Sequence, residues 1–363
     1  MNVPFVDLKA QYTSIKKEID LAVGEVISSA SFVGGEVVDT FENDFAKYSG
    51  SAHCVSCANG TDALEIALTV LGVGHGDEVL IPSMSWISTA SAVHAVGAKP
   101  VFVDVLPLIY TMDPEDIKRK ITPQSIAIIP VHLYGQMARM EEIMDIAKEN
   151  DLAVVEDAAQ AIGSMRNGHK AGFYGDLTTF SFYPAKNLGA FGNSGAIVTN
   201  EEVYAKSCRV MARHGQRAKN DHVALGRNSQ LNTLQAAVLT VKLKYIDQWN
   251  KKRQVISRAY DKLLRDLPIQ LPTIDSENKS NFHLYVIQVP NRDKVMELMK
   301  KAGVSCQIHY PVALPYMQPL KAFADGDYPV GKELGEKGLS LPMYPEMTED
   351  QVRYVVETLR NSI

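Results

Sequence analysis

The chain has few cysteines, no excess of basic residues and no long apolar run. Four cysteines in 363 residues do not form a disulfide framework, which indicates reduced thiols and a cytoplasmic protein. Lysine and arginine number 37 against 42 aspartates and glutamates, so no basic surface for nucleic acid is indicated. No apolar run reaches the ~20 residues that a membrane span needs. Residues 1–7 also lack the basic and apolar regions of a signal peptide.

The apolar content is 46% and the charged content 22%, as in ordinary globular proteins. A single core rarely grows beyond ~250–300 residues, so this length predicts two domains. Continuous apolar runs predict four buried strands, and residues 140–147 have helical spacing between two of them; the strands are 78–82, 99–104, 126–131 and 152–157. This alternation predicts an α/β fold with a mainly parallel sheet covered on both faces. Ligands of such sheets bind at the carboxyl ends of the strands.

The pattern changes in the C-terminal third of the chain. A long helical pattern covers residues 232–264, and prolines and a polar loop follow it. We then expect a strand at 282–289, a helix at 292–302 and a strand at 304–310. Thr348 and Gln351 have the spacing of a capping box before a final helix. These elements predict a smaller α+β domain at 250–363, after a large domain at 1–249.

Two local patterns resemble functional motifs. Cys54 and Cys57 form a Cys-x-x-Cys, which suits a redox pair or half of a zinc site. No second pair accompanies them, which favours buried structural thiols. The glycine-rich segment 72–76 precedes a strand instead of following one, so a turn is favoured over a dinucleotide site. No metal is expected, because the remaining candidates have no ligand spacing: His53, His94, His132 and His169.

Asp157 and Lys186 are the first two parts of a candidate active site. Asp157 ends a strongly apolar strand, where a buried carboxylate needs a partner; a salt bridge or a helix cap is the alternative role. Lys186 lies just past the strand that begins near Thr178, beside serine, tyrosine and asparagine residues. Although most lysines are solvated surface residues, this position suits a lysine that forms a Schiff base.

Two further segments complete the candidate site. Gly60 and Thr61 lie between a short apolar strand and an amphipathic helix, where free N–H groups can bind a phosphate; capping of the helix is the alternative. Trp86 follows the strand 78–82 and offers a flat stacking surface or a core side chain. A lysine, a carboxylate, a phosphate site and an aromatic surface together fit one cofactor, pyridoxal 5′-phosphate.

At these residues the sequence resembles the nucleotide-sugar aminotransferases of the DegT/DnrJ/EryC1/StrS family, which are fold-type-I pyridoxal-phosphate enzymes. The most specific matches are Val-Glu-Asp-Ala-Ala-Gln at 155–160 and Ser-Phe-Tyr-Pro-Ala-Lys-Asn-Leu-Gly at 181–189. Further matches lie at 3–8, 32–37, 234–237 and 308–311, so the resemblance covers nearly the whole chain. It implies a large cofactor domain with an N-terminal arm and a smaller C-terminal domain.

The resemblance also implies roles for individual residues. Lys186 is expected as the Schiff-base lysine, and Asp157 as the partner of the pyridine nitrogen. The other expected cofactor contacts are Gln160 at the phenolic oxygen, Trp86 on the ring, and Gly60, Thr61 and Ser181 at the phosphate. Asn228 matches an asparagine that enters the phosphate site of the neighbouring subunit. An obligate homodimer with shared active sites is therefore implied.

The segment at 183–190, Tyr-Pro-Ala-Lys-Asn-Leu-Gly-Ala, is similar to relatives that act at sugar carbon 3. The implied reaction moves an amino group from glutamate, leaving 2-oxoglutarate, to a UDP-linked 3-keto acetamido sugar or a dTDP-3-keto-6-deoxyhexose. We expect Tyr183 and His309 on the sugar side. Gln230 stands where relatives usually have arginine, which implies different anion recognition. Asn193 stands where many have aspartate, a second departure in the loop after Lys186.

Three other functions remain open. Relatives acting at sugar carbon 4 more often have histidine before the proline of this motif, so a 4-keto-sugar aminotransferase is the first. A pyridoxal-phosphate sugar dehydratase is the second, although such relatives replace the lysine with histidine. The third is a regulator that binds the cofactor without turnover, for which no helix-turn-helix or basic patch is present.

Overall fold

The computed structural model describes residues 1–363 and is built around one seven-stranded sheet. The strand order is β1-β9-β8-β5-β4-β2-β3. The four pairings from β3 to β8 are parallel, whereas β9 is antiparallel to both of its neighbours. The strands are β1 His53–Cys57, β2 Glu78–Pro82, β3 Lys99–Val103, β4 Ser125–Ile128, β5 Ala153–Asp157, β8 Leu177–Ser181 and β9 Gly195–Thr199. The α/β fold with a mainly parallel sheet is confirmed.

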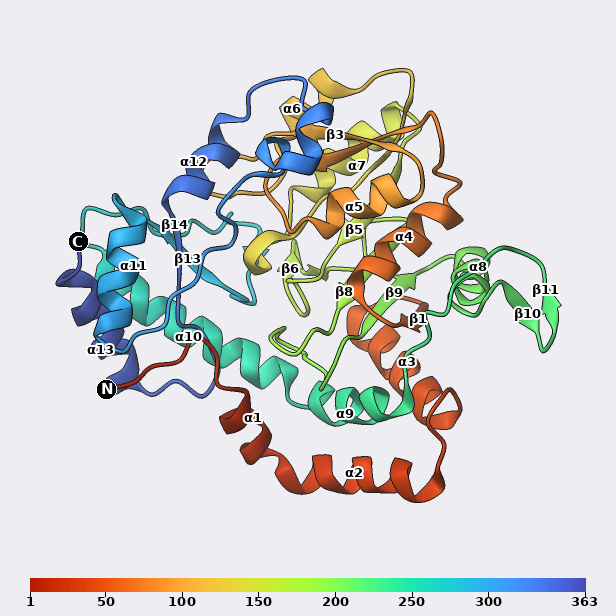
Figure 1. The fold of residues 1–363 in the computed structure, drawn as a ribbon, viewed down its shortest axis with the longest axis horizontal. Coiled ribbons are helices and arrows are strands. Elements are labelled where there is room, and N and C mark those ends of the chain that lie inside the picture. The colour runs from red at the N-terminus through yellow and green to blue at the C-terminus, as the bar shows by residue number, and fades with distance from the viewer.

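Helices cover both faces of this sheet (Figure 1). Alternate strand residues point to opposite faces, so Leu80 packs in one hydrophobic cluster and Ile81 in another. The Leu80 cluster includes residues of α3 Glu36–Ser49, α6 Pro114–Lys120, α7 Met140–Glu149 and α9 Thr233–Leu243. The Ile81 cluster includes residues of α4 Gly60–Val70, α5 Ser88–Ala95 and α8 Glu202–Ala212. Burial on both faces explains why the strands are apolar without alternation.

The two cysteines of the Cys-x-x-Cys pattern lie in β1, and both are free and buried. Cys54 packs in the Leu80 cluster and Cys57 in the Ile81 cluster. Burial raises the pKa of both thiols, so the reactive thiolate is disfavoured at neutral pH. They are core residues of an edge strand that is covered on both faces, as the favoured interpretation predicted.

The predicted helix at 232–264 is wrong as a single element. The structure has α9, which ends at Leu243, and then α10 Ile246–Leu264, with Lys244 and Tyr245 between them. Both helices bury one face, so the same apolar spacing continues across the break. The predicted boundary at residues 249–250 falls inside α10, which contributes Trp249 to the Leu80 cluster and Tyr260 to a separate C-terminal cluster. The division into two domains there stays a prediction.

The C-terminal cluster is the core of an α+β unit around a two-stranded sheet. Its elements are β13 Tyr285–Gln288, β14 Gly338–Leu341, α11 Arg292–Lys301, α12 Pro329–Lys337 and α13 Glu349–Arg360. Thr348 and Gln351 form the predicted capping box at the start of α13. The strand predicted at 304–310 is wrong, because only isolated bridges form there, at Val304 and Gln307. His309 and Tyr310 instead line a cavity between the two units.

The N-terminal segment connects both parts of the molecule. Val3 forms a parallel bridge with Val304 and belongs to the C-terminal cluster, where it is fully buried. Two helices follow, α1 Leu8–Ser14 and α2 Lys16–Ser29, and α2 packs on α9. The arm therefore runs from the smaller unit to the larger one (Figure 1).

Short elements complete the fold. A three-stranded sheet joins β6 Met165–Arg166 and β7 His169–Lys170 to β12 Asn278–Lys279. A hairpin of β10 Gln216–Ala218 and β11 Asp221–His222 projects beyond α8 (Figure 1). The 3₁₀ helices are η1 Leu133–Gly135, η2 Leu314–Tyr316 and η3 Gln318–Phe323. None of the helices combines the length and hydrophobicity required to span a bilayer.

Candidate active site

A cavity of about 630 Å³ opens at the carboxyl ends of β2, β5 and β8, where ligands of parallel sheets bind. Its size lies in the range of small-molecule sites. We call it the Lys186 cavity. Of the residues predicted for the site, all but one line it: Gly60, Thr61, Trp86, Asp157, Gln160, Ser181, Tyr183, Lys186 and His309. The exception is Asn228.

Asp157 and Lys186 reach the Lys186 cavity from neighbouring strands. Asp157 is the last residue of β5 and pairs in register with Thr179 of β8, and Lys186 follows the end of β8. Burial lowers the pKa of Lys186 to about 8, while the Asp157 charge opposes this change. Burial raises the pKa of Asp157, while the Ala159 N–H and Lys186 oppose it. The cavity thus contains a carboxyl group together with a lysine that loses its proton more easily than a solvated lysine does.

The Asp157 carboxylate is held from two sides. Its Oδ1 accepts from the Ala159 N–H at 3.2 Å, and its Oδ2 accepts from the Thr89 hydroxyl at 3.1 Å. Thr89 in turn lies 2.9 Å from the Ser85 hydroxyl. These contacts fix the direction of the carboxylate, so it can hold a proton of a ligand in a defined position.

The N-terminus of α4 forms one wall of the Lys186 cavity. Asn59 caps the helix by accepting from the Asp62 N–H at 2.9 Å. This leaves the N–H groups of Gly60 and Thr61 without a helical acceptor, next to the positive end of the helix dipole. The Ser181 side chain packs against Gly60 so closely that no side chain fits on the glycine. The wall therefore has the groups that bind a phosphate.

Aromatic and amide side chains form another wall. Trp86 is 56% exposed, and its ring centroid lies 5.4 Å from that of Tyr310. Gln160 accepts from the Tyr134 N–H at 2.6 Å and donates to the Tyr310 hydroxyl at 3.1 Å. These two bonds fix the orientation of the Gln160 amide. Trp86 is thus available to a flat ring instead of being a core side chain.

Two predicted sugar-side residues differ in their surroundings. Tyr183 is 54% exposed at the mouth of the Lys186 cavity. The His309 Nδ1 atom lies 2.8 Å from the Ser340 hydroxyl oxygen. Burial lowers the pKa of the His309 imidazole to about 4. His309 is therefore neutral at physiological pH.

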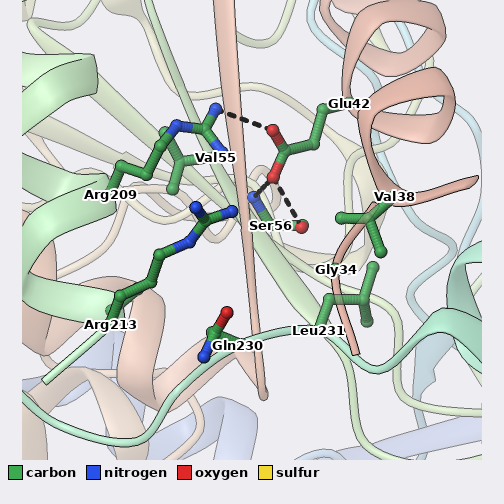
Figure 2. Close-up of a pocket in the computed structure, with 10 residues that line it drawn as sticks. Gly34, Val38, Glu42, Val55, Ser56, Arg209, Arg213, Gln230 and Leu231 are labelled. Carbon is green, nitrogen blue, oxygen red and sulfur yellow. Dashed lines mark hydrogen bonds and ion pairs between the residues drawn. The ribbon is translucent and has the colours of Figure 1, made fainter. Parts of the chain in front are cut away.

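Asn228 lies outside the Lys186 cavity of its own chain. It is exposed and forms an isolated bridge with Arg213 after the β10–β11 hairpin. Gln230 lines a separate small pocket beside Arg209 and Arg213 (Figure 2). In this pocket Arg209 donates to Glu42 at 2.7 Å, whereas Arg213 has no such partner (Figure 2). Asn193, the other departure from the family pattern, lines the Lys186 cavity.

Sequence reasoning missed several residues of the Lys186 cavity, among them Arg253, His283 and Tyr310. A signal for Arg253 exists, because it stands on the buried face of α10 between Trp249 and Ile256, where an apolar residue is expected. His283 and Tyr310 enter the cavity through tertiary packing and have no comparable local signal.

The comparisons with known proteins agree with this geometry. The family model of the DegT/DnrJ/EryC1/StrS aminotransferase family matches residues 13–360. The chain is 42% identical to a pleiotropic regulatory protein of Geobacillus stearothermophilus, over 99% of this chain and 98% of that protein. It is 39% identical to a UDP-2-acetamido-2-deoxy-3-oxo-D-glucuronate aminotransferase of Pseudomonas aeruginosa, over 99% of this chain and 100% of that protein.

A solved structure of DesV from S. venezuelae, in complex with a ketimine intermediate, superposes with a TM-score of 0.97. That chain is 37% identical, and the match covers 99% of this chain and 98% of that one. The residues of the Lys186 cavity fit pyridoxal 5′-phosphate, since they offer a lysine, a carboxylate, a phosphate site and a stacking surface. The chain belongs to the DegT/DnrJ/EryC1/StrS aminotransferase family and has the fold-type-I architecture of these pyridoxal-phosphate enzymes.

Proposed function

We propose that this enzyme transfers an amino group from glutamate to a nucleotide-linked keto-sugar, at carbon 3 of the sugar. The observation that carries the proposal is the convergence of Lys186, Asp157 and the free N-terminus of α4 on one cavity. The Pseudomonas relative is named for a 3-oxo sugar linked to UDP, which supports carbon 3. The acceptor classes are UDP-linked 3-keto acetamido sugars and dTDP-3-keto-6-deoxyhexoses.

Each predicted site residue in the Lys186 cavity has a proposed task. Pyridoxal 5′-phosphate supplies an aldehyde and a ring that withdraws electrons from the reacting carbon. The Lys186 Nζ binds the aldehyde and moves the proton at the reacting carbon; its pKa of about 8 suits both tasks near neutral pH. The Asp157 carboxylate keeps a proton on the ring nitrogen.

The remaining cofactor residues hold and orient the group. The N–H groups of Gly60 and Thr61 and the Ser181 hydroxyl bind the phosphate. The Trp86 ring would lie against the pyridine ring, and the Gln160 amide would hold the phenolic oxygen. Tyr183 and His309 orient the sugar; His309, being neutral, offers a hydrogen bond without a charge.

We further propose a homodimer in which Asn228 completes the phosphate site of the neighbouring subunit. Its exposed position outside its own Lys186 cavity supports this role. Large apolar side chains are exposed nearby in the chain or on a segment that pairs with it: Leu225 is 98% exposed, and Phe32 at 47% and Val33 at 66% belong to the segment that pairs with Asn232 and Thr233. A dimer contact is the proposed place for these side chains, because contiguous exposed apolar surface marks contact sites between proteins. Four free cysteines fit a cytoplasmic location.

A panel of UDP- and dTDP-linked 3-keto and 4-keto sugars, each with glutamate, tests the proposal. With the 3-keto compounds, we expect mass spectrometry to detect a nucleotide-linked amino sugar as the product. Amination of only the 4-keto compounds would show that the enzyme acts at carbon 4 of the sugar. Loss of water without amination would indicate a dehydratase.

The Geobacillus relative is named as a regulator, which makes cofactor binding without turnover the competing function. Exchange of the amino group between glutamate and isotopically labelled 2-oxoglutarate distinguishes the two. An aminotransferase catalyses this exchange with no sugar present. No exchange with any amino acid would favour the regulator.

A further inference from the structure

Lys242 is a buried cation on α9 that contacts the loop carrying Lys186. Its side chain belongs to a residue only 2% exposed, although lysine is rarely buried without an acidic partner. The Nζ atom donates to the Gly189 carbonyl at 2.6 Å and to the Gln11 Oε1 at 2.9 Å. It also lies 4.9 Å from the centre of the Phe191 ring, within the range of a cation–π contact. One ammonium group thus joins three segments: α9, α1 and the loop between β8 and β9.

The position of Lys242 would suit an apolar residue. Its neighbours Val238 and Val241 are buried on α9, and a methionine or leucine would be buried there without the cost of an ammonium group. Both oxygen acceptors of Lys242 are uncharged. Burial lowers the pKa of Lys242 to about 8, while the Glu346 charge opposes this change. A charged donor at this place indicates a task that an apolar side chain cannot perform.

The Gly189 carbonyl belongs to the turn that carries Lys186. The Ala190 N–H donates to the Phe182 carbonyl at 2.8 Å, which closes this turn. Within it, the backbone of Gly189 lies so close to Pro184 that no side chain fits on the glycine. A group that holds the Gly189 carbonyl therefore fixes the backbone on both sides of Lys186.

The same loop has a second attachment to α9. Gln235 precedes Lys242 by two helical turns, so the two side chains leave α9 on the same face. The Gln235 Oε1 accepts from the Phe191 N–H at 2.7 Å. Tyr12 of α1 adds an edge contact to the Phe191 ring, with the ring centroids 6.0 Å apart. The loop is thus held by α9 at two points and by the N-terminal arm beside them.

We propose that Lys242 is a positioning residue for Lys186, because its ammonium group holds the Gly189 carbonyl and so fixes the turn from which the catalytic amine extends. This inference rests on the proposed function, in which the Lys186 Nζ moves a proton at the reacting carbon. A charged donor forms a stronger hydrogen bond than a neutral one, so the turn keeps its place while Lys186 binds and releases the aldehyde. The arm takes part, since Gln11 accepts from the same ammonium group.

The test compares wild-type holoenzyme with Lys242→Met in the half-reaction with glutamate and in its reverse with 2-oxoglutarate. Methionine is similar in length but donates no hydrogen bond. Because Lys186 serves both directions, we expect both maximal rate constants to fall by a common factor of about 10- to 100-fold, as a small misplacement of a reacting group costs. The substrate concentrations that give half-maximal rates should stay unchanged. The absorbance of the bound cofactor follows both reactions.

A second readout follows Lys186 itself. In the full-length chain without cofactor, the rate of cofactor uptake should reach half its maximum near pH 8 in the wild type. In Lys242→Met this midpoint should lie at higher pH, because a loosened turn exposes Lys186 to water. Burial lowers the pKa of Lys186 and Asp157 is the charge that opposes it, so the shift reports lost burial. Lys244→Met is the matched control, since Lys244 follows the same helix but is exposed; both readouts should keep their wild-type values.

Gln11→Leu approaches the same ammonium group from the arm. It removes one acceptor and leaves α9 unchanged, so both readouts should move in the same direction by a smaller amount. This variant decides the test if Lys242→Met does not fold. Adding Gln11→Leu to a folded Lys242→Met should cause no further loss, because the two residues act through one contact.

Wild-type rate constants in a folded Lys242→Met would overturn the proposal. A higher half-saturating glutamate concentration with unchanged rate constants would make Lys242 a substrate-binding group and overturn it as well. Slower rates with an unchanged midpoint of cofactor uptake would show that Lys186 keeps its place, which also contradicts the proposal. If wild-type holoenzyme failed to react with glutamate, the proposed function itself would be wrong, whereas the uptake midpoint would still test the position of Lys186.

Discussion

Gly60 and Ser181 are in direct contact, although one begins α4 and the other ends β8. A Cβ atom on Gly60 would lie 2.8 Å from the Ser181 Cβ, closer than carbon atoms approach without displacement. This contact brings the free N–H groups of α4 and the Ser181 hydroxyl to the same point of the Lys186 cavity. The phosphate site that we propose depends on it.

Replacing Gly60 with alanine should therefore weaken cofactor binding. Displacing Ser181 costs about 1–3 kcal/mol, so the Kd for pyridoxal 5′-phosphate should rise roughly 10- to 100-fold. Equilibrium dialysis measures this Kd. Gly74→Ala is the control, since nothing lies within 4 Å of the added atom. Equal affinities in both variants would contradict the role of the contact.

The lowered pKa of Lys186 predicts a pH dependence. Without cofactor, the rate at which the protein takes up pyridoxal 5′-phosphate should rise with pH and reach half its maximum near pH 8, because the free amine reacts. The absorbance of the bound cofactor follows this rate. A midpoint near the ordinary lysine value of 10.5 would show that the amine is solvated.

The same shift affects the stability of the cofactor-free protein. Between about pH 8 and 10.5 the unfolded chain binds more protons at Lys186 than the folded chain does. The contribution of Lys186 to the free energy of unfolding therefore rises with pH through this window. Lys186→Met should remove that part of the pH dependence, which denaturant titrations at several pH values can measure.

Asp157→Asn should slow amino transfer while leaving the cofactor attached. The amide keeps the shape of the side chain but carries no charge to hold a proton on the ring nitrogen. We expect a loss of about 10²- to 10³-fold in the single-turnover rate with glutamate. Borohydride should still fix the cofactor on Lys186, as peptide mass spectrometry can show. Wild-type rates in this variant would exclude the proposed role of Asp157.

The shared active site predicts complementation between two inactive variants. Lys186→Ala and Asn228→Ala, unfolded and refolded together, should form mixed dimers with one intact site. Random pairing makes half of the dimers mixed, so about a quarter of the wild-type activity should return. Lys186→Ala refolded with Lys186→Gln is the control and should stay inactive. Failure to recover activity while mixed dimers form would place Asn228 outside the neighbouring site.

Much of the large unit could be predicted from local pattern. The strand at 78–82 matches β2 Glu78–Pro82 in full, because a short, continuous apolar run has few alternatives in a covered sheet. The meeting of Asp157 and Lys186 also follows from pattern, since Asp157 ends one apolar strand, Lys186 follows another, and the carboxyl ends of these strands share one edge. The structure adds that these two strands, β5 and β8, are direct neighbours in the sheet.

The remaining features depend on contacts between distant segments. The break at Lys244 and Tyr245 interrupts no apolar spacing, so it leaves no mark in the sequence. Arg253 enters the Lys186 cavity because carbonyl groups of residues 282, 283 and 343 hold it there. No rule of helix or strand periodicity contains that information.

The bridge between Val3 and Val304 has a consequence for how the molecule is made. During synthesis Val3 leaves the ribosome long before Gly303 and Val304, the residues that bind and cover it. Val3 therefore has no partner during the synthesis of the segments that form the large sheet. The core of the smaller unit thus combines the first residues of the chain with segments that are made about 300 residues later.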